Sequence, residues 1–442
     1  MLELDDIQHF LLQRKPALAA RYEFLTFQHA DAGRAWISGM IDKVGTGASV
    51  SPTSSGDRWV TLAFTWSGLR ALGVDEEALA TFPEEFRQGM AARAAILGAT
   101  GANHPDHWVR ELDTPALHAI AILFARDVAE RERAKQAHAD FLSQIGGVDV
   151  LSALDLEAIS RHEPREHFGY LDRRSEVVIE GVGDRPPHGW GPPVAAGEFF
   201  LGHPDESGST PTLPQPEILS KNGSYLAYMM LEEHVSVFRE FLRQHASTPE
   251  EQEMLAAKLM GRWRSGAPLV LAPHHDDPTL GTDLGRTNDF DYETMDPHGY
   301  ACPIGAHIRR MNPRETTEKG QRRRMIRRGG TYGPPLPEDA PDDGVERGVA
   351  AFLGCASLVR QFEFAMNVWV NDPNFMGLGN ERDPIIGTQD GTFDMTIQGR
   401  PIRKKITGLP AFTTLRAGAY FFLPGIRALR HLATNHRTTT GP

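Results

Sequence analysis

Cysteine is scarce in this chain. Only Cys302 and Cys355 occur among the 442 residues, and they lie far apart in sequence. Two such residues cannot form the disulfide framework of a small secreted protein, and this usage is typical of a reducing compartment. The apolar run Phe10-Leu11-Leu12 is too short for the core of a signal peptide. We therefore expect a cytoplasmic protein.

Long hydrophobic runs and an excess of positive charge are also missing. No stretch approaches the roughly 20 apolar residues of a membrane-spanning helix. Lysine and arginine number 46 against 58 aspartates and glutamates, which gives a net charge of -12. Proteins that bind nucleic acid carry positive charge to meet the phosphates. These absences predict no membrane span and no nucleic-acid partner.

The composition is that of a globular protein, with 40% hydrophobic and 24% charged residues. A chain of 442 residues is too long for one simple core, so we expect two domains. Periodicity predicts strands at 21–29, 57–65 and 118–125, and helices at 31–44 and from about 127 to 142. This order is the start of a ferredoxin-like α+β unit.

The second half of the chain resembles the first half at three places, in the same order. The paired segments are 118–125 with 348–356, 169–172 with 387–390, and 196–202 with 417–425. Three ordered matches indicate a duplicated domain. We therefore predict an α+β fold of two ferredoxin-like domains, residues 1–222 and 223–442. A pocket formed by two such units is a natural place for a cofactor.

The middle of the chain is looser and rich in proline and glycine. Long loops inside a compact protein are usually functional or disordered. Between the loops we expect a helix from about 223 to 242. Another helix begins at Thr248-Pro249, where an N-cap residue precedes a proline at the first helical position.

Residues 301–314 place a single histidine, His307, inside a small and apolar run that leads into three arginines. A neutral imidazole is the commonest protein ligand for iron, zinc and copper. In many haem proteins one histidine holds the iron, and nearby guanidinium groups pair well with propionate carboxylates. The alternative is a partly buried histidine beside a basic surface.

Five segments carry a resemblance to one known family. They are Glu-His-Phe-Gly-Tyr-Leu-Asp at 166–172, Gly-Glu-Phe-Phe-Leu-Gly at 197–202, Asn-Gly-Ser-Tyr-Leu at 222–226, residues 302–314, and Ile-Arg-Arg-Gly-Gly-Thr-Tyr-Gly at 326–333. Together they resemble the dye-decolourising peroxidases nearly from end to end. The resemblance implies haem b in a pocket of the second domain. It also implies reduction of hydrogen peroxide and one-electron oxidation of bulky aromatic donors such as dyes and phenolic compounds.

The resemblance assigns roles on the proximal side of the haem. His307 matches the family's axial iron ligand. Arg309, two residues after it, is expected to contact the cofactor because a guanidinium group beside the histidine can pair with a propionate, not because of the family pattern. A proximal histidine needs a partner on its other nitrogen, preferably a carboxylate. Asp390 matches the acidic position that the family uses for this purpose. The alternative for Asp390 is a turn residue, because Asp390-Gly391-Thr392 also suits a tight turn.

On the distal side, Asp172 matches the aspartate of the family's Gly-x-x-Asp-Gly motif. Such a residue can take a proton from bound peroxide and return it to the leaving oxygen. Arg327 matches the distal arginine, whose fixed charge favours anionic peroxide. The alternatives are a turn or capping residue for Asp172 and a solvated basic strand for Arg327.

One departure from the family pattern concerns the distal motif. Arg173 stands where the family has glycine, which allows close backbone approach or an unusual dihedral angle. An arginine there can strain the turn or pair with Asp172. The departure motivates a second hypothesis, a haem-binding protein of the same fold with little peroxidase turnover. The oligomeric state stays open.

Overall fold

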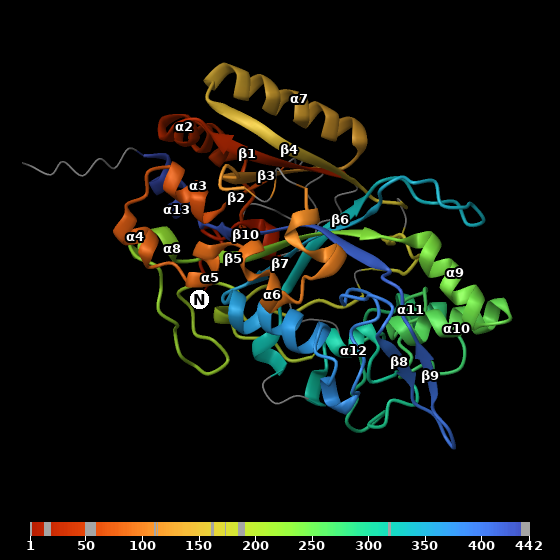
Figure 1. The fold of residues 1–442 in the computed structure, drawn as a ribbon. Coiled ribbons are helices and arrows are strands. Elements are labelled where there is room, and N and C mark those ends of the chain that lie inside the picture. The colour runs from red at the N-terminus through yellow and green to blue at the C-terminus, as the bar shows by residue number, and fades with distance from the viewer. Residues whose placement is uncertain are drawn as a thin grey trace, which may run out of the picture.

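The centre of the protein is an eight-stranded antiparallel sheet (Figure 1). The computed structural model describes residues 2–434 apart from 13–18, 49–58, 110, 111, 113, 161, 162, 173, 184–190 and 317–319. The strand order is β4-β1-β3-β2-β10-β5-β7-β6, and β8 and β9 form a separate hairpin. The strands are β1 (Ala19–Phe27), β2 (Val60–Phe64), β3 (Ala119–Ala125), β4 (Val148–Glu157), β5 (Ser224–Glu233), β6 (Ile326–Tyr332), β7 (Gly348–Cys355), β8 (Asp394–Ile397), β9 (Lys404–Thr407) and β10 (Thr413–Leu423).

Helices surround this sheet. None in the described ranges combines the length and apolarity that a membrane crossing requires. The α-helices are α1 (His9–Leu12), α2 (Ala30–Met40), α3 (Trp66–Ala71), α4 (Glu76–Ala80), α5 (Glu84–Gln88), α6 (Ala94–Leu97), α7 (Val128–Ile145), α8 (Glu217–Ser220), α9 (Val235–His245), α10 (Pro249–Met260), α11 (Pro278–Thr282), α12 (His307–Met311) and α13 (Ile426–Ala433). Two π-helical segments are η9 (Leu358–Glu363) and η10 (Ala365–Val370). Short 3₁₀ turns are η1 (Ile41–Lys43), η2 (Ala91–Arg93), η3 (Gly101–Asn103), η4 (Pro105–His107), η6 (Ala196–Glu198), η7 (Arg314–Thr316), η8 (Gly320–Arg323) and η11 (Phe375–Gly377).

The sheet consists of two halves with the same strand order. In the first half the order is β4-β1-β3-β2, so the first strand lies between the fourth and the third. The second half repeats this arrangement as β10-β5-β7-β6. The halves join where Phe64 of β2 pairs with Phe422 of β10. The prediction of an α+β fold with two ferredoxin-like units is confirmed.

The inner face of the sheet is enclosed because the sheet curls until its edge strands meet. The hydroxyl of Thr331 on β6 donates a hydrogen bond to the carbonyl oxygen of Glu157 on β4 at 2.7 Å. Inside, Tyr228 lies with its ring centroid 6.4 Å from that of Tyr22 and 5.0 Å from that of Phe352. Residues from both halves therefore share one core.

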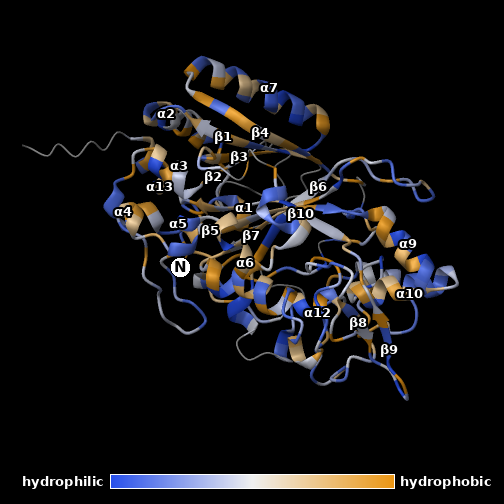
Figure 2. Cartoon of the chain, in the orientation of Figure 1, coloured by the Kyte–Doolittle hydropathy of each residue, from blue (hydrophilic) through white to orange (hydrophobic). Residues whose placement is uncertain are grey.

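On the outer face, helices α2 and α7 cover the first half. Trp36 of α2 and Leu142 of α7 belong to the same buried cluster as Ala121 of β3. Helix α7 is capped at its N-terminus by Asp127, whose carboxylate accepts the N–H of Glu130 at 2.8 Å. It lies over β1 and β4 (Figure 1), and polar and apolar residues alternate along it (Figure 2). This pattern is typical of a helix with one face on a sheet.

On the second half the cover is different. The π-helical segments η9 and η10 follow β7, as α7 follows β3. Helix α9 packs against α10 through Phe238, Phe241 and Leu255. The described residues 261–316 and 320–325 then form α11, α12, the turns η7 and η8, and long loops before the chain enters β6. These elements lie beside the second half in Figure 1 and enclose the cavity described below.

Two expectations from the sequence are wrong. Residues 224–233 form strand β5, and α9 begins only at Val235, so the helix expected from about 223 to 242 is mostly strand. A strand that is apolar on both sides lacks the alternation that separates it from a buried helix. Residues 417–425 lie mostly in β10, whereas 196–198 form a 3₁₀ turn, so this pair is not a repeat. The pair 118–125 and 348–356 is equivalent, as β3 and β7.

Candidate active site

A cavity of about 380 Å³ lies against the outer face of β5, β6 and β7. Because side chains alternate along a strand, every second residue of β5 and β7 faces it. Pockets of about 300 to 1,000 Å³ hold small ligands and cofactors. The strand residues that face the cavity are Met229, Leu231 and Glu233 of β5 and Val349, Ala351 and Leu353 of β7.

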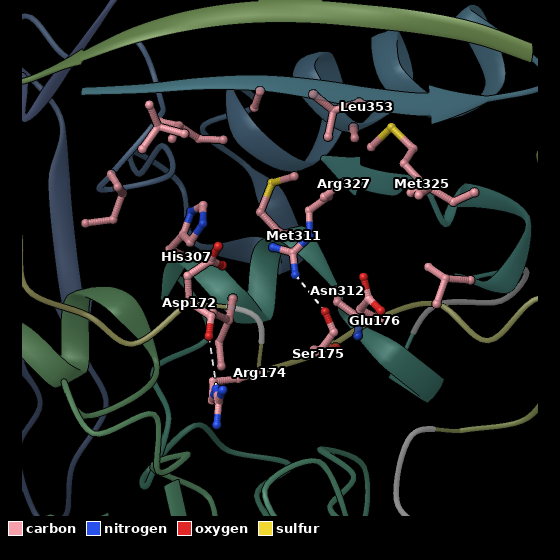
Figure 3. Close-up of a pocket in the computed structure, with 18 of the residues that line it drawn as sticks. Asp172, Arg174, Ser175, Glu176, His307, Met311, Asn312, Met325, Arg327 and Leu353 are labelled. Atoms are coloured by element: carbon pink, nitrogen blue, oxygen red, sulfur yellow. Dashed lines mark hydrogen bonds between the residues drawn. The ribbon is translucent and has the colours of Figure 1, made fainter. Parts of the chain in front are cut away.

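His307 is the first residue of α12 and lines this cavity (Figure 3). Its Nδ1 lies 2.9 and 3.1 Å from the two carboxylate oxygens of Asp383. A carboxylate only accepts hydrogen bonds, so Nδ1 carries the hydrogen and Nε2 is the nitrogen available to a metal.

The Asp383 side chain is fully withdrawn from solvent, at 0% exposure. Its Oδ1 also accepts the backbone N–H groups of Ile385 and Ile386, each at 2.9 Å. Burial by itself raises the pKa of this carboxyl, but the charge and hydrogen bond of His307, the N–H of Ile386 and the charge of Arg310 lower it overall. Asp383 is therefore an ionised and fixed partner for the histidine.

Asp390 does not hold His307, contrary to the expectation from the sequence. It is exposed, and its Oδ1 accepts the backbone N–H of Thr392 at 2.9 Å and the hydroxyl of the same residue at 2.5 Å. Gly391 between them has a φ of +84°. Asp390 is thus the residue of a tight turn, and the carboxylate that meets His307 lies seven positions earlier at Asp383.

Arg309 also differs from its expected place. It is almost fully buried and does not line the cavity. Its Nη1 donates to Asp296 Oδ2 at 3.1 Å and to the Cys302 carbonyl oxygen at 2.8 Å. Side chains two positions apart on a helix point in different directions. Arg309 therefore holds the loop before α12 through its hydrogen bonds, while His307 faces the cavity.

Asp172 reaches the cavity from a tight loop. Gly169, with a φ of +95°, reverses the chain so that Leu171 pairs with Arg165. The Asp172 N–H then donates to the Pro164 carbonyl oxygen at 2.7 Å. Asp172 and His307 both line the cavity, and Figure 3 draws both side chains. The neighbouring Arg173 lies outside the described residues.

Arg327 enters the same cavity from β6 (Figure 3). Its Nη2 donates to the Ser175 carbonyl oxygen at 3.0 Å. The adjacent Arg328 donates to the carbonyl oxygens of Phe10 and Leu11 at 2.8 and 3.0 Å and pairs with Glu176 at 2.9 Å. Arg328 thus holds the N-terminal segment against β6. The structure brings His307, Asp172 and Arg327 together around one space.

Three further arginines of the cavity wall, Arg262, Arg314 and Arg324, have no carboxylate partner among the described residues. Arg262 is buried, and burial followed by the nearby charge of Arg314 lowers its pKa to about 9. The same two causes lower the pKa of Arg324 to about 10. Buried charges are normally paired. An anionic group bound in the cavity would supply the partner that these arginines lack.

A second cavity of about 290 Å³ adjoins the first, between β1 and β6. Asp172, Arg327 and Glu166 line both cavities. The second cavity also has an aromatic wall that includes Phe10 and Trp59. Asp172 and Arg327 therefore stand where two internal spaces meet.

Comparison with known proteins agrees with this architecture. A dye-decolorizing peroxidase of Mycena epipterygia is 31% identical to this chain over 415 residues, which cover 85% of this chain and 76% of that protein. One from Exidia glandulosa is 30% identical over 455 residues, which cover 97% and 86%. The chain belongs to the dye-decolourising peroxidases. No protein-family model matches the sequence.

Solved structures of dye-decolourising peroxidases have the same fold. A DyP-type peroxidase of Auricularia auricula-judae superposes with a TM-score of 0.86 at 26% identity and covers 98% of this chain and 100% of its own. An ancestral D-type dye-decolourising peroxidase gives 0.86 at 27% identity, with coverage of 98% and 99%. The protein is therefore a peroxidase, and peroxidases of this family are haem enzymes.

The residues of the cavity fit such a cofactor. A histidine with Nδ1 fixed and Nε2 available suits axial ligation of iron. Cationic groups without a protein anion, such as Arg262 and Arg324, suit propionates. The role of Asp383 was not expected from the sequence. One signal was available, because Asp383 directly precedes the apolar run Pro384-Ile385-Ile386. A carboxylate that is buried together with such a run needs a specific partner.

Proposed function

We propose that this dye-decolourising peroxidase binds haem b through His307 and uses it to reduce hydrogen peroxide and oxidise aromatic donors. The observation that carries the proposal is the single cavity that holds His307, Asp172 and Arg327. When bound, the haem iron supplies the centre at which the O–O bond is cleaved and through which electrons leave the donor one at a time. The roles below belong to the protein.

His307 would hold the iron through Nε2, and Asp383 orients the ring and strengthens its donor character through Nδ1. The charge of Arg310 lowers the pKa of Asp383, and Arg310 is itself fixed by donation to the carbonyl oxygens of Trp369 and Glu381 at 2.6 Å each. The guanidinium groups of Arg262, Arg314 and Arg324 would meet the propionates. Without the hydrogen bond to Asp383, neither the position nor the tautomer of the His307 ring is fixed.

Asp172 takes the proton from bound peroxide and returns it to the leaving oxygen. It is suited to this work because it faces the cavity from a loop that is fixed by backbone hydrogen bonds. Arg327 contributes a fixed positive charge that favours the anionic form of peroxide and stabilises charge that develops during O–O cleavage. Its hydrogen bond to the Ser175 carbonyl oxygen limits its movement.

The donor is a phenolic or dye-like aromatic molecule. One structural neighbour with a TM-score of 0.86 at 26% identity is a dye-decolorizing peroxidase in complex with 2,6-dimethoxyphenol. We carry this class of donor over to the present chain because the fold matches over 98% of its length.

Two further assignments accompany this proposal, the domain boundary and the location of the protein in the cell. We place the domain boundary at residues 222 and 223, because β5, the first strand of the second half, begins at Ser224. We keep a cytoplasmic location, which rests on two cysteines that are both buried and free.

The test is the visible absorption spectrum of haem-supplied protein before and after one equivalent of hydrogen peroxide. The unmodified protein should show a ferric haem band that shifts promptly on addition of peroxide. His307→Ala should fail to retain haem. Asp172→Asn should retain haem and react with peroxide at least about a hundredfold more slowly, the size of a general acid–base contribution.

Two outcomes would contradict the proposal. A His307→Ala variant with full haem and an unchanged spectrum would remove the ligand assignment. A stable haem band that peroxide leaves unchanged would favour haem binding without turnover. In that case Arg173→Gly is the next variant, and a large gain in peroxide reactivity would identify Arg173 as the cause.

A further inference from the structure

Two carboxyl groups, Glu166 and Glu233, meet on the wall of the cavity. Glu233 is the last residue of β5, and strand alternation turns its side chain to the same side as Met229 and Leu231. Glu166 opens the tight loop that ends at Asp172. A strand end and a loop from different halves of the chain thus bring two acids together.

The hydrogen bonds of the pair differ between its members. Glu166 accepts the backbone N–H groups of Phe168 at 2.8 Å and Tyr170 at 2.6 Å, one on each oxygen. Glu233 accepts one, the N–H of His167 at 3.2 Å. The N–H donors of His167 and Phe168 are consecutive in the chain, so they bring the two carboxyls close together, and the charge of Glu166 acts on the pKa of Glu233. Two carboxylates that lie close together in a buried site favour a proton on one of them.

Neither glutamate forms an ion pair in the part of the chain that the structure describes. The charge of Arg264 lowers the pKa of Glu166, but its Nη1 is paired with Glu253. Asp172 adds a further negative charge toward Glu233. Burial lowers the pKa of the remaining neighbour, His167, to about 4, which leaves that ring uncharged at neutral pH.

Burial and the charge of the neighbouring Glu166 raise the pKa of Glu233 well above its ordinary value. Burial also raises the pKa of Glu166 to about 7, although two backbone N–H groups act against it. Because both oxygens of Glu166 are already occupied by N–H donors, the proton resides on Glu233. Like charges that share a site cannot both ionise at neutral pH.

We propose that Glu166 and Glu233 hold one shared proton and pass it to Asp172 while the donor is oxidised. The proposal rests on the proposed proton-transfer role of Asp172. Peroxide itself brings the proton that Asp172 moves to the leaving oxygen, so that step needs no other proton. The second oxygen of peroxide would leave as water only after it gains two electrons from the aromatic donor and two protons. Asp172 would deliver these protons, and each time the pair would give its proton to Asp172 and take up another. Glu166 also lines the second cavity, so a proton can return to the pair from a side away from the bound peroxide.

A purely structural role is the competing explanation, because Glu166 caps the loop that carries Asp172. The variant Glu233→Gln separates the two. Its amide oxygen can accept the His167 N–H, and its amide nitrogen can donate to Glu166, so every hydrogen bond of the protonated pair is kept. Only the exchangeable acid proton is lost. A structural role predicts no change in this variant.

The test uses haem-loaded protein and two measurements. The first is the infrared band of a protonated carboxylic acid, followed from pH 5 to pH 9 without peroxide. We expect a band that persists at neutral pH in the unmodified protein and is lost in Glu233→Gln. The second is the rate at which an aromatic donor restores the original haem band after peroxide has shifted it, as a function of pH. We expect this step to be about tenfold slower in Glu233→Gln and to lose one ionisation from its pH profile, while the reaction with peroxide keeps its rate.

The matched control is Glu232→Gln, at the adjacent residue of β5 whose side chain faces Arg416 at 3.5 Å. It should keep both the band and the profile. Absence of the infrared band at neutral pH, or an unchanged profile in Glu233→Gln, overturns the proposal. The infrared measurement needs neither peroxide nor a working Asp172. Failure of the proposed function of Asp172 would therefore appear separately, as a slow reaction in the unmodified protein with the band intact.

Discussion

The two halves of the sheet each bury a glutamate from their first strand, and the two acids have opposite surroundings. Glu23 of β1 meets His138 at 2.5 Å and Arg21 at 2.6 Å. Glu233 of β5 meets another carboxyl. The pKa of Glu23 is lowered, because the His138 and Arg21 interactions outweigh burial, whereas the pKa of Glu233 is raised. The first half neutralises its buried acid, while the second keeps one that can exchange a proton.

The same contrast holds for the packing of the outer face. In the first half, Ala121 of β3 is fully buried in a cluster that includes Trp36. In the second half, Ala351 of β7 lines both cavities. The two alanines lie on corresponding strands, because β3 and β7 are each the third strand of their half and pair with the first strand, β1 or β5. One fold thus provides a closed core in one half and an open site in the other.

The largest expected effect comes from filling these two positions. Ala351→Phe should abolish haem uptake, because the ring occupies the cavity, and should leave the fold intact. Ala121→Phe should destabilise the protein by about 1–3 kcal/mol, because an overpacked core forces side chains off their preferred rotamers. Haem titration followed by absorbance, and guanidinium unfolding followed by fluorescence, measure the two effects.

Ala351→Gly is the control at the cavity and should bind haem normally. The contrast between the halves fails if Ala351→Phe still takes up a full equivalent of haem. It also fails if Ala121→Phe unfolds at the same guanidinium concentration as the unmodified protein.

The second prediction concerns stability and pH. Glu23→Gln should cost about 1–3 kcal/mol at neutral pH, because it removes the charged partner of the buried His138, whereas Arg21 keeps its ion pair with Asp155 at 2.8 Å. The pKa of Glu23 is lower in the folded protein than in the unfolded chain. Its contribution to the free energy of unfolding is therefore present at pH values above the unfolded-state pKa, and it is lost as the pH falls through the folded-state pKa. The cost of Glu23→Gln should therefore shrink in acid.

Glu233→Gln should show the opposite trend. The pKa of Glu233 is higher in the folded protein than in the unfolded chain. Its contribution to the free energy of unfolding is therefore present at pH values below the unfolded-state pKa, and it is lost as the pH rises through the folded-state pKa. Relative to the unmodified protein, the variant should gain stability between pH 5 and pH 8, since it has no proton to lose. Guanidinium midpoints of the haem-loaded proteins at several pH values measure both slopes, and parallel slopes would show that the two acids are alike.

The fold could be predicted largely because the first half obeys simple periodicity. Strands β1 and β3 and helices α2 and α7 lie where alternation and helical spacing place them. The error at β5 has a physical cause. This strand has helices on one side and the enclosed core on the other, so residues 225–230 are buried on both faces and show no alternation.

The site residues were predictable where whole segments resemble the family, rather than from residue type alone. His307, Asp172 and Arg327, which were assigned in this way, line one cavity. Arg309 and Asp390 were assigned by nearness in sequence or by match to an acidic position, and both serve local structure. Sequence spacing does not tell which of two arginines on a short helix faces a cavity. Nor does it tell which of two aspartates seven residues apart, Asp383 or Asp390, folds back to a histidine.

The smallest expected effect comes from replacing these two aspartates, Asp383 and Asp390, one at a time. Asp383→Asn should weaken haem retention by about 10- to 100-fold, as expected when the carboxylate that orients a metal ligand is removed. The amide can still accept the Nδ1 hydrogen but lacks the charge that strengthens His307 as a donor. Asp390→Asn keeps an oxygen that can accept the Thr392 N–H, so haem retention should not change.

Transfer of haem to an acceptor protein with an excess of sites measures the loss for each variant. If Asp390→Asn released haem faster than Asp383→Asn, the turn would be the true support of His307 and the hydrogen bond at 2.9 Å would be incidental. The reverse order would show that the second half depends on one buried carboxylate to make an open cavity into a haem site.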